Sequence, residues 1–450
     1  MTIDKLHGNY RSGLDTVTSV VSGYFEKMDR SADLNAYLSK FRESALQRAA
    51  QMDSELKRRS FDQLVKEHPL LGVPMAIKDN LHIRGEITTC GSQFLANYRA
   101  PFDATCIAKL ASAGVIFLGK TNMDEFAMGG SGENSAFGPT RHPLDRDRVP
   151  GGSSSGSAVA VASDMAVAAL GSDTGGSIRL PASFCGIVGL KPTYGRVSRY
   201  GLVAFGSSLD QVGPMAATVT DVKRVFEIIQ GHDPRDSTSA RVSESFGLKG
   251  SPHESGKLRV GVPHEFFVDG IDTDVRRSVQ AALKGLESRG AQLIPISLPH
   301  SVHAVPVYYV IAMAEASSNL SRFDGVRFGV RSDVAAQSES LEDFYPDARS
   351  IFGKECKRRI LLGGFVLSAG YHDAYYRKAC QVRELIAEDF RKAFLSVDVI
   401  AGPARSVTGG DFVRDTRTIL RREPPSPSRG NRIPRRSCRC RRWPRGLSRK

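Results

Sequence analysis

The sequence predicts an α/β protein in which helices cover both faces of a β-sheet. Short apolar segments typical of buried strands alternate with segments of helical periodicity. The chain has 450 residues, 41% of them hydrophobic, which suffices for a sizeable core in one large domain or two. No window approaches about 18 uninterrupted apolar residues, and the N-terminus lacks the apolar stretch of a secretion signal. We therefore expect neither a membrane span nor export.

The first half of the chain gives four expected elements. Residues 1–60 are charged and rich in helix formers, and we expect them to wrap the outside of the fold. LGVPMAIKDN, from Leu71, is a buried strand that ends at a lysine, and VIFLGKTN, from Val115, is another. Residues 105–113 form the helix between these strands.

The second half continues the alternation after a polar interruption. The segment 232–256 is rich in Ser, Pro, Gly and charges, and we interpret it as a surface excursion. KLRVGVP at 257–263 and AQLIPISLP at 291–299 are expected strands. The helix between them begins near Thr273 and has its apolar residues on one face. We expect both strands to continue the same sheet.

Two serines and a lysine lie in Gly/Ser-rich or turn-like settings: Lys78 in PMAIKDN, Ser153 in GGSSSGSAVAVAS and Ser177 in GSDTGGSIRLPASFCG. A serine hydroxyl is a poor nucleophile until a neighbour takes its proton. The small residues before Ser177 allow several backbone N–H groups to converge beside its hydroxyl, as in an oxyanion hole. The loop 151–156 lacks the Gly-Lys-Ser/Thr of a P-loop. An ordinary loop leading into a small-residue helix at 158–169 is its alternative interpretation.

Taken in order, the three segments resemble the amidase signature family, whose fold is a single large mixed β-sheet flanked by helices. The resemblance implies that Ser177 is the nucleophile, Ser153 a bridging serine preceded by a cis peptide bond, and Lys78 the base. It places the oxyanion hole at the backbone amides of Thr174, Gly175, Gly176 and Ser177 itself, and involves no metal. The base must be uncharged, whereas a free lysine has a pKa of about 10.4, so burial or neighbouring donors must lower the pKa of Lys78.

Three further segments resemble the A subunits of bacterial glutamyl-tRNA(Gln) amidotransferases: TNMDEFAMGGSGENSAFGPTRHP from Thr121, EASSNLSRFDGVRFG from Glu315 and KRRILLGGFVLSAGYHDAYY from Lys357. This resemblance implies a glutaminase subunit that supplies ammonia for converting Glu-tRNA(Gln) to Gln-tRNA(Gln). It implies a cytoplasmic heterotrimer with B and C subunits, in which ATP, Mg²⁺ and most tRNA contacts belong to B, and no cofactor in this subunit. A stand-alone amidase acting on small amides shares the triad and is the alternative.

The resemblance also implies a glutamine pocket. Arginine suits the α-carboxylate because its guanidinium bonds bidentately, and the pair Arg358–Arg359 supplies it. The pair Tyr308–Tyr309 lines the pocket, and Ser131 lies beside the triad. The sequence leaves open which member of each pair points inward, and an ordinary solvated helix face is the alternative for the arginines.

The resemblance covers residues 1–403, the expected amidase domain, and stops before an Arg-rich segment at 404–450 that we expect to be disordered. That segment carries +12 of the formal net charge of +14, so the residues before it are close to neutral. We interpret it as the product of a shifted reading frame; a basic RNA-binding tail is the alternative. The C-terminal part of the sheet, and an aspartate that binds the amino group of glutamine in the family, are then expected to be missing, which places the activity of this chain in question.

The cysteines support a reducing compartment. Of seven, two lie in the Arg-rich segment, and the other five show no paired spacing, which favours free thiols. Cys185 follows Ser177 by eight residues, and we interpret it as a small core residue rather than a second nucleophile.

Overall fold

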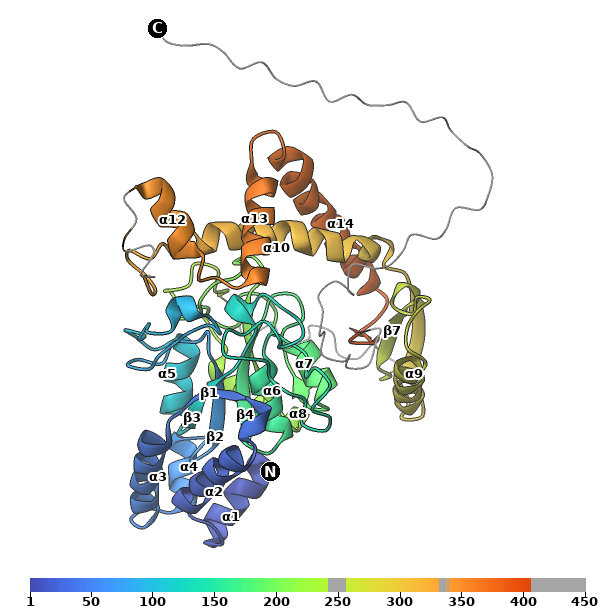
Figure 1. Ribbon diagram of the computed structural model, residues 1–450. Coiled ribbons are helices and arrows are strands. Elements are labelled where there is room, and N and C mark those ends of the chain that lie inside the picture. Colours follow the sequence, from blue (N-terminus) through green and yellow to red (C-terminus); the bar gives the residue numbers. More distant parts are fainter. Residues whose placement is uncertain (242–255, 332–336, 338–339, 406–450) are drawn as a thin grey trace, which may run out of the picture. The chain divides into compact units, whose positions relative to one another are not determined.

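The computed structural model describes residues 1–241, 256–331, 337 and 340–405, all within the unit Met1–Phe412 (Figure 1). Residues 406–450 lie outside this description. The domain boundary at 403/404, the shifted frame and the missing C-terminal strands therefore stay predictions. Among the described helices, none is long and apolar enough to cross a membrane.

The central sheet has six strands in the order β1-β3-β2-β4-β6-β5. They are β1 (Tyr37–Lys40), β2 (Pro74–Lys78), β3 (Ile116–Thr121), β4 (Ala168–Asp173), β5 (Val188–Gly189) and β6 (Gln211–Ala216). β2 runs parallel to β3 and β4, while β1, β5 and β6 pair antiparallel, so the sheet is mixed. β2, β4 and β6 are buried along their whole length, as expected for strands covered on both faces.

Helix α6 (Ser155–Ala162) packs directly on β2, β3, β4 and β6. Its small residues permit this close approach, and the segment from Ser155 to Val161 is fully buried. The expected helix at 158–169 is therefore correct only to Ala162. After a left-handed turn at Asp164, the chain enters β4 in the middle of the sheet. Small apolar residues fill both elements, so composition alone does not mark the boundary.

The other helices near the central sheet come mostly from the first half of the chain. They are α1 (Ile3–Ser12), α2 (Val17–Arg30), α3 (Arg42–Leu56), α4 (Phe61–Glu67), α5 (Thr105–Ser112), α7 (Arg179–Phe184) and α8 (Val219–Ile229). α2 packs on α3 and α3 on β3, while α8 packs on both α5 and β6. The α/β class and the mixed sheet flanked by helices are thus confirmed, as is the helical character of the N-terminal segment.

A second sheet corrects one expectation. Strands β7 (Arg259–Pro263) and β8 (Gln292–Ile296), joined by α9 (Thr273–Glu287), pair parallel with each other and with β9 (Val399–Ile400) instead of extending the central sheet. Their pairing is reinforced by an ion pair of 2.9 Å between Arg259 and Asp398. β7 thus has partners on both sides within the second sheet, and β5, only two residues long, ends the central one.

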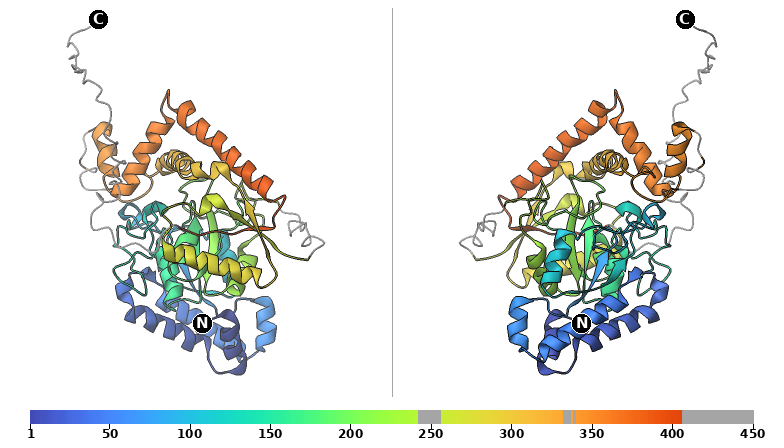
Figure 2. Two further views of the ribbon diagram at one scale, coloured as in Figure 1. Left: turned by 90° about the vertical axis from the view of Figure 1, so that its right-hand side faces the viewer. Right: turned by 90° about the vertical axis from the view of Figure 1, so that its left-hand side faces the viewer.

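A helical layer brings the distant C-terminal segments to the sheet. It contains α10 (Ala304–Leu320), α12 (Leu341–Arg349), α13 (Lys354–Leu367) and α14 (Lys378–Ala393). α10 packs on α13 and α14, and these helices lie on the side of the central sheet away from α1–α4 (Figures 1 and 2). Phe94, Phe126, Phe323 and Phe352 join this layer to the loops after β2 and β3, with the rings of Phe94 and Phe352 stacked at 4.6 Å.

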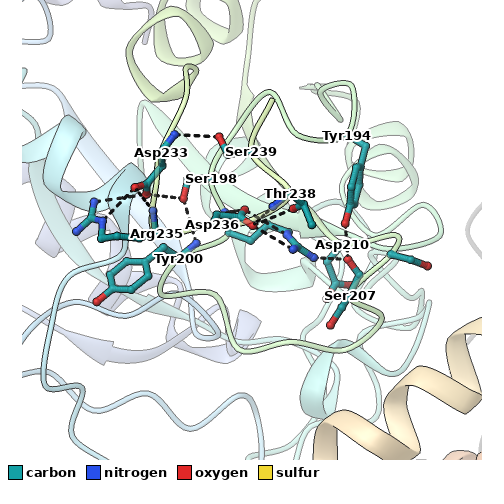
Figure 3. Close-up of polar contacts among 12 residues, drawn as sticks. Tyr194, Ser198, Tyr200, Ser207, Asp210, Asp233, Arg235, Asp236, Thr238 and Ser239 are labelled. Carbon is teal, nitrogen blue, oxygen red and sulfur yellow. Dashed lines mark hydrogen bonds and ion pairs between the residues drawn. The ribbon is translucent and has the colours of Figure 1, made fainter. Parts of the chain in front are cut away.

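We expected the segment 232–256 to be a surface excursion, but its described part is held to the fold by buried polar contacts. Asp233 and Asp236 are buried, 3% and 7% exposed. The Asp233 carboxylate accepts from the hydroxyls of Thr105 and Ser198, and that of Asp236 pairs with Arg199 at 3.1 Å (Figure 3). Buried carboxylates need such donors, which the polar composition did not reveal. Residues 242–255 lie outside the description.

The contact of α6 with the sheet predicts the effect of one substitution. A Cβ at Gly156 meets the backbone oxygen of Ala36 at 2.3 Å and the backbone nitrogen of Asn122 at 2.6 Å. We expect Gly156→Ala to lower the free energy of unfolding by about 1–3 kcal/mol in urea denaturation, because backbone atoms cannot move aside. Gly8→Ala, on the open face of α1, is the matched control and should raise stability by up to about 1 kcal/mol. Equal effects of the two substitutions would contradict this account.

Candidate active site

Lys78 is the last residue of β2, and its side chain is completely buried. Its Nζ donates to Ser153 Oγ at 2.7 Å and to Ser172 Oγ at 2.9 Å. Burial lowers the pKa of Lys78 to about 7, against the opposing influence of the carboxylates of Asp124, Asp173 and Asp210. Near neutral pH a large fraction of this amine is therefore uncharged and able to accept a proton from Ser153.

Ser153 follows a cis peptide bond to Gly152, as the resemblance implied. Two backbone hydrogen bonds hold this turn: Gly152 N donates to Gly130 O at 2.9 Å, and Asp124 N donates to Ser153 O at 3.3 Å. A third, from Ser154 N to Ser177 O at 3.1 Å, places the segments that carry the two serines side by side. The structure thus joins Lys78 to Ser153 directly and brings the backbone next to Ser153 to that of Ser177, while the roles of the three residues stay predictions.

Asp124 lies beneath this turn, although the sequence did not single it out. It is completely buried, and its carboxylate accepts from the backbone N–H groups of Gly132 at 3.1 Å and Asn134 at 2.9 Å. A Cβ at Gly152 would lie 2.1 Å from this carboxylate and 3.1 Å from Ser131 N. Ser131 thus lies beside the triad, where the resemblance placed it, and the glycine permits the close approach.

The loop 174–177 carries Ser177, the expected nucleophile, and is called the nucleophile loop below; it turns around a second buried carboxylate. Asp173 ends β4, accepts from Gly176 N at 2.7 Å and Ile178 N at 3.1 Å, and pairs with Arg179 at 3.0 Å. These bonds close a tight loop that leaves Ser177 only 7% exposed. Gly176 has a φ of 123°, a region that glycine adopts without strain.

This geometry refines the expected oxyanion hole. The Gly176 N–H is already bonded to Asp173, so it is engaged within the loop. The amides of Thr174, Gly175 and Ser177 remain the expected donors to a developing oxyanion. Such preorganised donors act where negative charge appears during attack on a carbonyl carbon.

The structure distinguishes the members of the tyrosine pair. Tyr308, on α10, packs its ring on the nucleophile loop, where a Cβ at Gly175 would lie 2.5 Å from the ring. Burial raises the pKa of Tyr308 to about 12, so its phenol stays neutral at physiological pH. Tyr309 is 41% exposed. Tyr308 is therefore the member beside the triad.

The arginine pair divides in the same way. Arg359, on α13, is 6% exposed, donates to Glu355 Oε1 at 2.6 Å, and lies 5.7 Å from the ring centre of Phe205. The Arg358 side chain is 57% exposed and pairs with the same glutamate. The solvated-face interpretation therefore fits Arg358, whereas Arg359 lies within the fold next to Tyr308.

Sequence reasoning missed the acceptors around the triad, of which Ser172, Asp124 and Asp173 are the main ones. All three stand inside the quoted segments, but nothing in the sequence around them marks them as hydrogen-bond partners of these loops. Cys185, by contrast, behaves as predicted: it is buried, and burial raises the pKa of its thiol to about 12. A thiol of that pKa is not a nucleophile near neutral pH.

Comparison with known proteins agrees with this geometry. Residues 19–418 match the protein family described as Amidase. The chain is 52% identical over 402 residues to the A subunit of glutamyl-tRNA(Gln) amidotransferase from Carboxydothermus hydrogenoformans, covering 89% of this chain and 81% of that protein. It is 58% identical over 343 residues to the protein of the same name from Oleidesulfovibrio alaskensis, covering 76% and 70%.

Solved structures give the same picture. The A subunit of glutamyl-tRNA(Gln) amidotransferase from Thermotoga maritima superposes with a TM-score of 0.71 at 38% identity, covering 93% of this chain and 82% of that one. Native peptide amidase from Stenotrophomonas maltophilia has the same TM-score at 29% identity, covering 91% and 86%. The fold is thus shared with amidases of different substrates.

The buried amine predicts how the reactivity of Ser177 depends on pH. Protonated Lys78 cannot accept the proton that Ser153 relays, so the rate of phosphonylation of Ser177 by a fluorophosphonate should fall by up to about tenfold per pH unit as the pH drops from 7 toward 6. Mass spectrometry of the peptide that carries Ser177 measures this rate, with Ser177→Ala as the unlabelled control. A rate that is flat between pH 5 and 8 would refute the assignment of Lys78 as base.

Proposed function

The chain belongs to the amidase family, and on that premise we propose that it is the glutamine-hydrolysing component, the A subunit, of a tRNA-dependent amidotransferase. The observation that carries the proposal is a lysine–serine contact of 2.7 Å beside Ser177 in a chain 52% identical, over most of its length, to the A subunit of a glutamyl-tRNA(Gln) amidotransferase. The ammonia it releases serves the conversion of Glu-tRNA(Gln) to Gln-tRNA(Gln).

In the first half-reaction Ser177 Oγ attacks the side-chain amide carbon of glutamine. Its proton passes to Ser153 Oγ, and the proton of that hydroxyl passes to the neutral amine of Lys78. The amides of Thr174, Gly175 and Ser177 receive the oxyanion. As the tetrahedral intermediate collapses, the relay runs in reverse and protonates the leaving nitrogen, so that ammonia departs and a γ-glutamyl ester of Ser177 remains.

In the second half-reaction water attacks this ester. The relay accepts a proton from the water through Ser153, and the same amides stabilise the second oxyanion. Collapse releases glutamate and returns Ser177 to its hydroxyl form. Each half-reaction needs Lys78 neutral at its start, which its complete burial favours.

Recognition of glutamine rests on α10 and α13. Arg359 offers its remaining N–H groups to the α-carboxylate, because one edge of its guanidinium is already held by Glu355. Tyr308 lies between this arginine and Gly175 and forms the pocket wall next to the oxyanion hole. Ser131, whose backbone lies beside Gly152, contributes polar groups to the pocket next to Ser153.

The remaining parts of the proposal concern the assembly. Relatives named as A subunits imply a complex with other subunits, and we assign these as B and C subunits in a heterotrimer. ATP, Mg²⁺ and most tRNA contacts belong to B, and this subunit uses no cofactor of its own. We place the complex in the cytoplasm, in agreement with the free thiols of the described cysteines at 90, 106, 185, 356 and 380.

The test is glutamate release from glutamine by the full chain co-expressed with B and C subunits. We expect turnover, loss of turnover in Ser177→Ala, and turnover near that of the unaltered chain in Cys185→Ala. Peptide amidases share the fold, so small amides and peptide amides are assayed in parallel. Turnover of those substrates without glutamine turnover would replace the proposal with a stand-alone amidase.

The division of the arginine pair predicts a difference between two matched variants. Arg359→Lys keeps the charge but loses the bidentate guanidinium, and should raise KM for glutamine about 10–100-fold, as expected for a charge-assisted hydrogen bond worth about 1.5–3 kcal/mol. Arg358→Lys alters an exposed side chain and should change KM less than about threefold. Steady-state kinetics with glutamine measures both. A larger effect at position 358 would assign the pocket to the other arginine.

A further inference from the structure

A buried carboxylate outside the triad supports the nucleophile loop from behind. Asp210 is 3% exposed and immediately precedes β6. Because Gln211 pairs with Asp173 at the end of β4, the register brings Asp210 next to Thr174. The Thr174 hydroxyl donates to Asp210 Oδ1 at 2.6 Å. This contact joins the nucleophile loop to the segment before the neighbouring strand.

The Asp210 carboxylate also folds its own loop. Oδ1 accepts from Gly206 N at 3.1 Å, and Oδ2 accepts from Phe205 N at 2.9 Å. Three donors therefore converge on two oxygens. A carboxylate meets this demand because it only accepts, whereas an asparagine would place an NH₂ group against an N–H or O–H donor.

The loop from Phe205 to Asp210 is fixed independently of the triad. From α10, Asn319 Nδ2 donates to Phe205 O at 3.0 Å, and Glu315 Oε2 accepts from Ser208 N at 2.8 Å. From the other side, the Tyr194 hydroxyl donates to Ser207 O at 2.7 Å (Figure 3).

Arg199 extends this support. It also donates to Ser207 O, and it is itself held by the buried Asp236 (Figure 3). The loop that carries Asp210 is thus held by hydrogen bonds from α10, Tyr194 and Arg199, and Thr174 is hydrogen-bonded to Asp210.

We propose that Asp210 is a positioning residue for the hydrolytic reaction, acting in its ionised form through the Thr174 hydroxyl to hold the oxyanion amides in place. The proposal rests on the proposed amide hydrolysis. An O–H to carboxylate bond of this length is charge-assisted and stronger than a neutral one. Donors act at about 2.7–3.1 Å from the oxyanion and must be held within about 0.5 Å of that position, so fixing Thr174 raises the rate without touching the substrate.

Because the proposed role requires an ionised Asp210, protonation of Asp210 should lower the reaction rate. A purely structural role would leave the pH dependence of the rate unchanged. Burial raises the pKa of Asp210 to about 6. The charged and titratable groups that interact with it are Arg199, Lys78 and Tyr308. Below about pH 6 the protonated carboxyl must itself donate and can no longer serve three donors.

As the pH falls, two protonations then lower the rate of Ser177 phosphonylation. Lys78 is protonated near pH 7 and Asp210 near pH 6. The slope of log rate against pH should approach two below pH 6. In Asp210→Asn the second protonation is absent, so the slope should return to one. The pKa of Lys78 should also fall, because a neighbouring negative charge has been removed.

The experiment compares Asp210→Asn, Thr174→Val, Thr174→Ser and the double variant Asp210→Asn with Thr174→Val. The matched control is Asp221→Asn: Asp221 is 1% exposed and accepts from the Thr218 hydroxyl at 2.7 Å and from Ile3 N, but it belongs to α8 and touches no part of the site. The primary readout is the rate of phosphonylation of Ser177 by a fluorophosphonate at pH 5–8, with thermal unfolding as a check on folding.

We expect Thr174→Val and Asp210→Asn each to slow phosphonylation about 10–100-fold. The double variant should be no slower than the slower single variant. Asp221→Asn, outside the site, should stay within about threefold of the unaltered chain, and Thr174→Ser, which keeps the hydroxyl, should lose less rate than Thr174→Val. Where the complex turns over glutamine, the loss should appear in kcat more than in KM, because the oxyanion forms after binding.

The proposal is overturned if Thr174→Val labels at the unaltered rate, if the effects of Thr174→Val and Asp210→Asn multiply, or if Asp210→Asn keeps the steeper acid slope. Valine keeps the branched shape of threonine, so the variants at position 174 decide the matter even if Asp210→Asn fails to fold. Because phosphonylation needs no glutamine, a chain that labels at Ser177 but leaves glutamine intact would refute the proposed function alone.

Discussion

The buried amine of Lys78 is the constraint on which the rest of the site depends. An ammonium without water is costly, and three features accommodate this one: two serine hydroxyls within 2.9 Å, a pKa near 7 that allows it to be neutral, and three buried carboxylates around it. The same burial that lowers the pKa of the amine makes it a base. A site with an exposed lysine would lack the function even if its serines were unchanged.

The central sheet creates this arrangement. β2 and β4 run parallel and adjacent, so Lys78 and Ser172 meet at the same end of the sheet. β6 pairs with β4, which sets Asp210 behind Thr174. Two loops of small residues then approach this edge. The loop that carries Ser177 closes on the buried Asp173, and the turn that carries Ser153 lies against the buried Asp124, whose backbone N–H donates to Ser153 O. The helical layer adds Tyr308 and Arg359 from segments far along the chain.

Local sequence was sufficient for the strand ending at Lys78 and for the strand after it, because each is a short apolar segment, whereas the roles of the two serines came from the family resemblance and stay predictions. It was insufficient where the outcome depends on partners distant in the chain. The boundary between α6 and β4 is hidden by uniform small residues, and β7 and β8 form their own sheet because β9 pairs beside them. The choice of Arg359 over Arg358, and of Tyr308 over Tyr309, is made by the packing of α10 on α13. The aspartates at 124, 173 and 210 act through backbone donors that no pattern displays.

The most direct test of the account is a crystal structure of the chain phosphonylated at Ser177. The account predicts a phosphonyl oxygen within hydrogen-bond distance of the amides of Thr174, Gly175 and Ser177, with Ser153 Oγ between the modified serine and Lys78 Nζ. A phosphonyl oxygen directed to other donors, or a Lys78 amine that has moved out to solvent, would contradict it.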